Sequence, residues 1–171
     1  MIVNEIMLDF FRNYVHLEVH FSPGVNLIYG ENAQGKTNLL EAIAYLSTAA
    51  SHRARYDREL IHFGVDHAFV KGEVVSRKRN FSLEARLSRG TRRQLFANGV
   101  KLKTAEGLSG ILNTVLFCPE DLYLIREGAA ARRRFLDECI CQLRPKYAAA
   151  LTEYRKLYDH KTRILKDWEE K

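Results

Sequence analysis

The chain has 171 residues and a formal net charge of +6 at pH 7, and its length suits one domain. Hydrophobic residues make up 46% of it, which is enough for a buried core and excludes intrinsic disorder. Three cysteines with no Cys-x-x-Cys pair exclude a disulfide framework and a zinc site. The first ten residues do not resemble a secretory signal, and no run of 18 apolar residues could span a membrane, so we expect a cytoplasmic chain.

The basic surplus is confined to one part of the chain. Residues 75–103 carry nine basic residues and one acidic residue, Glu84, whereas the segments on either side have no such excess. The nine are Arg77, Lys78, Arg79, Arg86, Arg89, Arg92, Arg93, Lys101 and Lys103. A local positive field of this kind attracts polyanions, although a solvated surface with nothing bound would show the same composition.

The N-terminal third predicts a hairpin, a strand and a helix. Residues 2–8 and 15–21 are rich in apolar and β-branched side chains around a turn at Asn13-Tyr14, which is typical of a β-hairpin. The apolar run at 25–29, bounded by glycines, predicts a buried strand. From Lys36 the apolar spacing is that of an amphipathic helix, which should end near residue 50.

In the rest of the chain the spacing of hydrophobic residues changes twice. Residues 67–103 alternate with period 2 and contain Asn98-Gly99, a strong type I′ turn signal, so they predict an antiparallel meander that holds the basic residues. Residues 111–117 predict another strand. From Gly128 to Lys171 the chain should be helical with an interruption at Pro145, because proline lacks the N–H that a helix interior requires.

One motif carries chemistry. Residues 30–37 match G-x-x-x-x-G-K-[ST] at every fixed position, which is roughly a 1% event by chance in a chain of this composition. The residues are Gly30, Glu31, Asn32, Ala33, Gln34, Gly35, Lys36 and Thr37. In such a loop the backbone N–H groups face phosphate oxygens, the lysine reaches the β- and γ-phosphates, and the Thr hydroxyl binds Mg²⁺.

The context of the motif favours a phosphate loop. A predicted strand precedes it and a predicted helix follows it, so the helix N-terminus adds its positive dipole end. The alternative is a glycine loop that only joins strand to helix, with Lys36 on the surface. The sequence therefore predicts binding of a nucleoside triphosphate with Mg²⁺.

The order of elements narrows the class of nucleotide-binding protein. A hairpin before the loop, and Asn32 inside it, resemble the ATP-binding cassette branch that includes SMC ATPases. Four blocks together resemble the RecF family of bacterial DNA replication and repair proteins: LDFFRNY (8–14), FSPGVNLIYGENAQGKTNLLEAI (21–43), SHRARYDRELIHFG (51–64) and FCPEDLYLIREGAAARRRFLD (117–137). The chain departs from that family's pattern at Ala129, where proline is common, which puts only the local turn in question.

The resemblance implies a fold, a function and partners. The fold is an α/β P-loop NTPase lobe of the ABC/SMC type, with an antiparallel meander and a C-terminal helical segment. The function is that of a weak, DNA-stimulated ATPase which forms an ATP-dependent homodimer, binds single-stranded or gapped DNA, and acts with RecO and RecR to load RecA in replication, recombinational repair and SOS induction. Cofactors would be ATP and Mg²⁺, with Arg12 and Arg53 resembling basic residues that reach the nucleotide or DNA, and Phe11 and Asn13 as further candidates for adenine contacts.

Two parts of a cassette ATPase are not recognisable in the sequence. Neither an apolar strand ending in Asp-Glu nor a Ser-Gly-Gly signature is found; residues 115–121 imitate the first poorly, and Leu108-Ser109-Gly110 predicts a turn. We therefore expect the N-terminal part of a longer protein: an ATP-binding lobe at 1–125 that includes the meander 67–103, and the start of a helical second lobe at 126–171. Such a chain should bind ATP without hydrolysing it. Its central sheet should lack the strands that the rest of the longer protein normally supplies.

DNA binding by the basic meander is a separate hypothesis. Arg77, Lys78, Arg79, Arg92 and Arg93 are its candidate residues. Phe81 and Phe96 could stack on bases, but their alternation favours the core. A second cluster at 132–134 could face DNA or another lobe.

Three alternatives to a RecF-type function remain open. Another SMC/ABC-type ATPase fragment would share most of these features, and so would a module whose nucleotide only fixes its shape. A P-loop kinase or GTPase is disfavoured by the upstream hairpin and by the lack of an Asn-Lys-x-Asp motif.

Overall fold

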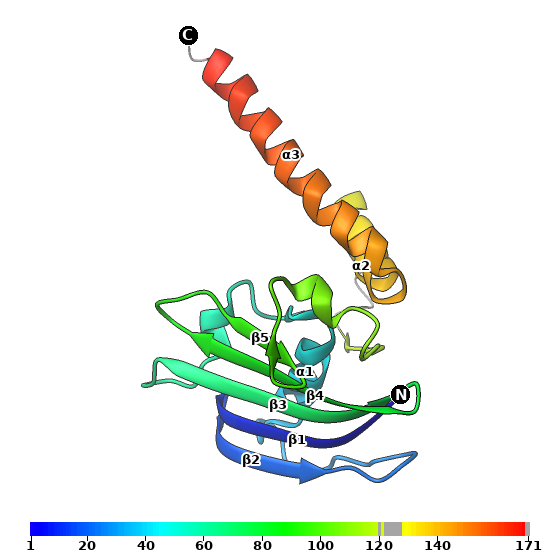
Figure 1. Ribbon diagram of the computed structural model, residues 1–171. Coiled ribbons are helices and arrows are strands. Elements are labelled where there is room, and N and C mark those ends of the chain that lie inside the picture. The colour runs from blue at the N-terminus through cyan, green and yellow to red at the C-terminus, as the bar shows by residue number, and fades with distance from the viewer. Residues whose placement is uncertain (120, 122–127, 170–171) are drawn as a thin grey trace.

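The computed structural model describes residues 1–119, 121 and 128–169, and its centre is one antiparallel sheet (Figure 1). The strand order is β2-β1-β3-β4-β5-β6. The strands are β1 (Ile2–Phe11), β2 (Tyr14–His20), β3 (His67–Ser76), β4 (Arg79–Ser88), β5 (Gln94–Ala97) and β6 (Val100–Lys101). The predicted hairpin and the predicted meander are both confirmed, and β1 joins them by pairing with β3.

The core lies between one face of this sheet and the helix α1 (Lys36–Thr48), and we call that face the inner face. Alternate residues of the central strands point inward and are buried: Ile6, Leu8, Val70, Val74, Leu83 and Leu87. Leu39, Ala42, Tyr45 and Leu46 of α1 belong to the same buried cluster. The helix ends as predicted near residue 50, where Ala49 takes a left-handed conformation with φ of 52°.

A glycine sets how closely α1 approaches the sheet. Gly72 lies in the middle of β3 on the inner face, and a Cβ built there would lie 2.6 Å from Cδ1 of Leu46. Its φ is not in the left-handed region, so the need for glycine is steric.

Two short 3₁₀ segments and two helices complete the described chain. The segment η1 (Asp57–Glu59) follows α1, and η2 (Ala105–Leu108) follows the meander. Helix α2 (Ala129–Leu143) and helix α3 (Pro145–Glu169) confirm the predicted interruption, since Pro145 starts α3 at a position where its missing N–H is not needed. Figure 1 shows α3 extending away from the sheet.

Two predicted strands do not form. Residues 25–29 and 111–117 have irregular backbone, with Leu27 82% exposed and Val115 fully exposed. An apolar run becomes a strand when a neighbour accepts its backbone hydrogen bonds, and no described strand pairs with either segment. The Leu108-Ser109-Gly110 segment is a turn, as predicted. The expected lobe boundary at 125–126 lies outside the described residues.

No helix in the described part of the chain is both long and apolar enough to span a membrane.

Substituting Gly72 should test the close packing of α1 on the sheet. We expect Gly72→Ala to lower the free energy of unfolding by about 1 to 3 kcal/mol, because the new methyl group displaces Leu46 within a packed core. Urea unfolding followed by circular dichroism measures this. The control is Gly90→Ala, where the added Cβ meets nothing within 4 Å, and its stability should change by less than about 1 kcal/mol. Equal stabilities of the two variants would contradict the steric interpretation.

Candidate nucleotide-binding site

The predicted phosphate loop leads into α1 through three residues with positive φ. They are Gly30 (148°), Ala33 (65°) and Gly35 (105°), and the helix begins immediately afterwards at Lys36. The N–H groups of residues 31–35 have no hydrogen-bond acceptor within the described part of the chain. A loop at a helix N-terminus with free N–H groups is suited to binding an anion.

The Lys36 ammonium group folds back over the loop. Its Nζ donates hydrogen bonds to the carbonyl oxygens of Gly30 (2.7 Å) and Glu31 (2.5 Å). Gly30 and Glu31 are exposed and Lys36 is partly exposed, so a ligand in solvent could reach the ammonium group. Thr37 is exposed as well, and no hydrogen bond occupies its hydroxyl among the described residues, which leaves an oxygen that could bind Mg²⁺.

The loop is braced from the β1–β2 turn. Nδ2 of Asn13 donates to the carbonyl oxygen of Gln34 (3.1 Å), and Nδ2 of Asn38 donates to Oδ1 of Asn13 (2.8 Å). Arg53 extends the chain of contacts by donating to Oδ1 of Asn38 (3.1 Å). The loop is therefore tied through side chains to the turn, to α1 and to the segment after α1.

Gly35 makes this brace sterically possible. A Cβ at Gly35 would lie 2.7 Å from the side-chain atoms of Asn13 and 2.8 Å from the ring of Tyr14. Its φ of 105° adds a second reason for glycine, since side chains rarely tolerate that conformation. The second glycine of the motif thus lets the loop contact the turn directly.

A fully buried carboxylate, Glu41 of α1, anchors the same turn. Nε and Nη2 of Arg12 donate to its two oxygens at 2.9 and 2.7 Å, and the Ser51 hydroxyl donates to Oε1 at 2.5 Å. Burial opposes ionisation, but the hydrogen bonds from Arg12 and Ser51, with the charges of Arg12 and Arg53, outweigh it and hold the pKa of Glu41 below its usual value. Arg12 takes a left-handed φ of 54° and also donates to the carbonyl oxygen of Glu59.

The structure therefore separates the predicted nucleotide-site residues into two groups. Residues 30–37 form one loop, whereas the guanidinium group of Arg12 is bound to Glu41 and that of Arg53 lies beside Asn38. Phe11 is fully buried in the core, where no adenine can reach it. Sequence reasoning missed Glu41 and Asn38, because a polar residue in an amphipathic helix gives no signal that distinguishes a buried partner from a solvated one.

The candidate DNA-binding residues lie at opposite ends of the sheet. Arg77 and Lys78 form the β3–β4 turn and Arg79 begins β4; all three are exposed and lie beside the start of β1, where Ile2 pairs with Val75. Arg92 and Arg93 precede β5 at the other end, which also holds the β1–β2 turn. Nη1 of Arg93 forms an ion pair with Asp57 (3.0 Å), whose other oxygen accepts a hydrogen bond from the hydroxyl of buried Tyr45, so Arg93 anchors η1.

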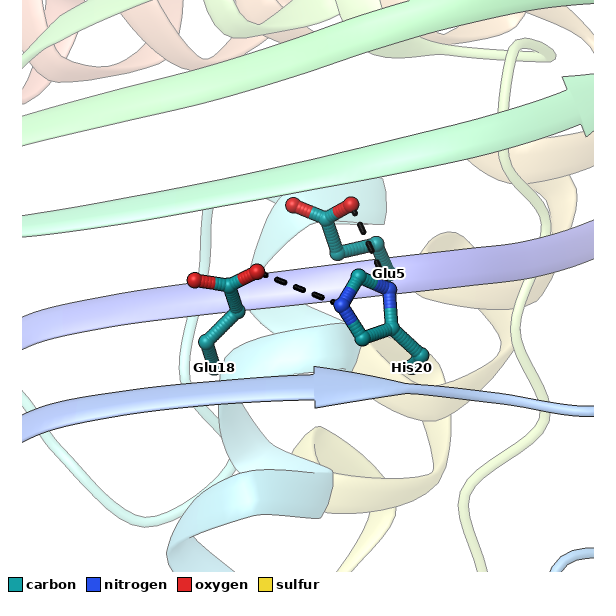
Figure 2. A group of neighbouring side chains, drawn as sticks. All are labelled: Glu5, Glu18 and His20. Atoms are coloured by element: carbon teal, nitrogen blue, oxygen red, sulfur yellow. Dashed lines mark ion pairs between the residues drawn. The ribbon is translucent and has the colours of Figure 1, made fainter.

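One further polar cluster lies on the exposed face of the β1–β2 hairpin. Figure 2 shows His20 between Glu5 and Glu18, with its Nδ1 3.5 Å from Glu5 and its Nε2 3.2 Å from Glu18. The three side chains have ligand atoms within 4.8 Å of one another. Both ring nitrogens already face a carboxylate, so contacts among these three side chains account for the arrangement.

Comparison with known families and proteins agrees with the loop geometry. Residues 5–106 match the model of a family described as AAA domain. The chain is 41% identical over 167 residues to the DNA replication and repair protein RecF of Lachnospira eligens, and 44% identical over 168 residues to that of Agathobacter rectalis. Each alignment covers 98% of this chain and 46% of the relative, so the chain spans less than half the length of these curated proteins.

Solved structures give the same result. A solved structure of the recombination mediator protein RecF with ATP, from the RecFOR pathway, has a TM-score of 0.92 and 38% identity, over 96% of this chain and 44% of that one. A structure from work on ATP-driven dimerisation and DNA-stimulated activation of SMC ATPases has a TM-score of 0.65 at 21% identity, over 80% of this chain and 98% of that one. The second likeness shows a shared P-loop NTPase fold.

Removing the charge of Glu41 should destabilise the fold. We expect Glu41→Gln to lower the free energy of unfolding by about 3 kcal/mol, because the Arg12 guanidinium group loses its charged partner in a largely buried position. Urea unfolding at pH 7 measures the loss. Glu18→Gln, which breaks an exposed contact with His20, is the control and should cost less than about 1 kcal/mol. A loss no larger in Glu41→Gln than in the control would show that the buried pair is not an anchor.

The same pair should give a characteristic pH dependence. Because the pKa of Glu41 is lowered by folding, its ionisation stabilises the native state fully above the unfolded value of 4.5, and this contribution disappears as the pH falls through the folded pKa. The difference in unfolding free energy between the unmodified chain and Glu41→Gln should therefore be largest at neutral pH and shrink below about pH 4.5. Unfolding curves for both proteins at a series of pH values test this. A difference independent of pH would contradict it.

Proposed function

The chain belongs to the AAA domain family, and we propose that it is the ATP- and Mg²⁺-binding part of a RecF-type DNA replication and repair protein. The observation that carries the proposal is the braced phosphate loop. Its N–H groups at 31–35 lack acceptors among the described residues, and its Lys36 ammonium group lies over the loop on two carbonyl oxygens. A loop that only joined the preceding irregular segment to α1 would not need this brace.

Each residue of the loop has a distinct part in this proposal. Lys36 exchanges two neutral carbonyl acceptors for anionic phosphate oxygens, with which it forms stronger, charge-assisted hydrogen bonds. Thr37 supplies its hydroxyl to Mg²⁺, which neutralises phosphate charge when it is bound. Asn13 holds the carbonyl oxygen of Gln34 and so keeps the N–H side of the loop turned toward the ligand.

The biological role follows from the relatives and is proposed on their account. The similar proteins are named for DNA replication and repair, and the similar structure for recombination mediation with ATP. We propose that the protein to which this chain corresponds binds DNA as an ATP-dependent homodimer. It would act with RecO and RecR to load RecA at single-strand gaps, and would thereby support SOS induction.

The test is nucleotide binding by the whole chain. A fluorescent ATP analogue titrated with Mg²⁺ should bind, and Lys36→Ala should weaken binding by about tenfold or more, because a charge-assisted hydrogen bond to phosphate is lost. ATP should displace the analogue better than GTP does. Thr37→Val should reduce the gain in affinity that Mg²⁺ provides, whereas Lys101→Ala, an exposed lysine on β6, serves as the control and should bind normally.

Two outcomes would overturn the assignment. One is a folded chain that does not bind the analogue, and the other is binding that Lys36→Ala leaves unchanged. Slow or absent phosphate release in a multiple-turnover assay remains a prediction from the missing acidic strand and signature. A rate that matches intact relatives and is lost in Lys36→Ala would contradict it.

A further inference from the structure

We propose that the β3–β4 turn and the hollow beside it bind the sugar-phosphate backbone of single-stranded DNA. We call this surface the hairpin-tip surface; it comprises Arg77, Lys78, Arg79 and the neighbouring residues that line the hollow. The choice of DNA as the polyanion rests on the proposed function. The location of the surface rests on charge, backbone conformation and shape.

The three cations of the tip are free of intramolecular partners. Among the described residues, no carboxylate or carbonyl group accepts a hydrogen bond from the side chains of Arg77, Lys78 or Arg79, and all three are exposed. Other members of the basic block are engaged: Arg86 binds Glu84, Arg89 donates to the carbonyl oxygen of Val65, and Arg93 binds Asp57. Arg92, Lys101 and Lys103 are also unpaired among the described residues, but the tip is where three unpaired cations follow one another along the chain.

The geometry of the β3–β4 turn does not explain why Arg77 and Lys78 occupy it. Arg77 and Lys78 both have positive φ, 49° and 64°, in a two-residue turn that Asn-Gly would form with less strain. The neighbouring β5–β6 turn uses that favoured pair, with Asn98 at 50° and Gly99 at 75°. A left-handed backbone at two residues with long side chains lowers stability. The strain therefore points to a role for the two cationic side chains and not for the turn.

A hollow of about 470 Å³ lies directly beside the turn. It is lined by Ser76, Arg77, Arg79, Phe81, Ser109, Gly110 and Ile111. Arg79 and Phe81 occupy alternate positions of β4, the same positions that point to the inner face further along the strand, and Phe81 packs partly against the core. Guanidinium groups at the rim and an apolar wall suit a phosphate group and the sugar attached to it.

The hairpin-tip surface is remote from the phosphate loop. The strand β3 runs from the phosphate-loop end at His67 to the tip at Ser76, so the two regions lie at opposite ends of the sheet. A single strand bound at the tip would leave the nucleotide site accessible. Binding of DNA and binding of ATP can therefore be measured and disrupted separately.

The experiment measures binding of a fluorescein-labelled dT30 to the whole chain by anisotropy, between about 50 and 200 mM KCl. We expect the triple variant R77N/K78G/R79Q to bind about tenfold or more weakly at the lowest salt, with the slope of log K against log salt reduced by about 2, because three phosphate contacts are lost. The variant K161Q/R163Q/K166Q removes the same number of positive charges from α3 and should bind within about twofold of the unmodified chain.

Folding and nucleotide binding are checked in the same variants. R77N/K78G places the favoured residues in the turn, so its thermal midpoint should be equal to or higher than that of the unmodified chain while its DNA affinity falls. The fluorescent ATP analogue should bind all of these variants normally. Weak DNA binding by a more stable protein that still binds ATP would therefore establish the surface.

Three results would overturn the proposal: a triple variant that binds dT30 like the unmodified chain, an equal loss in the α3 control, or an unmodified chain that binds ATP and no DNA. Failure to bind ATP is a different result. It would overturn the proposed function and leave any loss of DNA binding at the tip as evidence for this surface alone.

Discussion

The position of the phosphate loop depends on the fully buried carboxylate of Glu41. Glu41 receives two hydrogen bonds from Arg12 and one from Ser51, and so joins α1 to the β1–β2 turn and to the segment that follows α1. A buried ion pair is weak evidence for stability, because well-packed apolar residues can do as well, but an unpaired member is costly. The pair therefore permits one alignment of turn and helix and penalises the others. In that alignment Asn13 contacts both Gln34 and Asn38.

This arrangement gives the loop two chemically different sides. The brace holds the carbonyl oxygen of Gln34 and the backbone of Gly35 against the turn, while the N–H groups of residues 31–35 are left without acceptors in the described chain. Residues 31–34 are exposed, and exposed donors lose little when they exchange water for a phosphate group. The brace also fixes the loop before a ligand arrives, which reduces the conformational entropy lost on binding. Rigidity on one side thus supports binding on the other.

Local patterns in the sequence were sufficient for the features that depend on neighbours in the chain. The loop motif, both hairpin regions, α1 and the break at Pro145 follow from glycine positions, alternation and the chemistry of proline. Residues 25–29 and 111–117 were predicted wrongly, because an apolar run has the same composition whether or not a strand lies beside it. The Arg12–Glu41 pair joins residues 29 apart and has no periodic signature. Its place inside the fold comes from the packing of α1 on the sheet.

The sequence also placed the basic residues correctly in the meander, but it could not show which of them are paired within the fold. Pairing within the fold decides which cations remain free: Arg93 serves η1, whereas the tip of the β3–β4 hairpin has no acidic neighbour in the described chain that binds it. The strand β1 runs between the two regions, with Arg12 beyond one end and Ile2 paired to Val75 near the other. The phosphate loop and the tip therefore lie at opposite ends of the same sheet, so substitutions can be made in one region without touching the other. Between the two regions α1 packs closely on the sheet at Gly72, where Leu46 fills the space that a side chain would otherwise take.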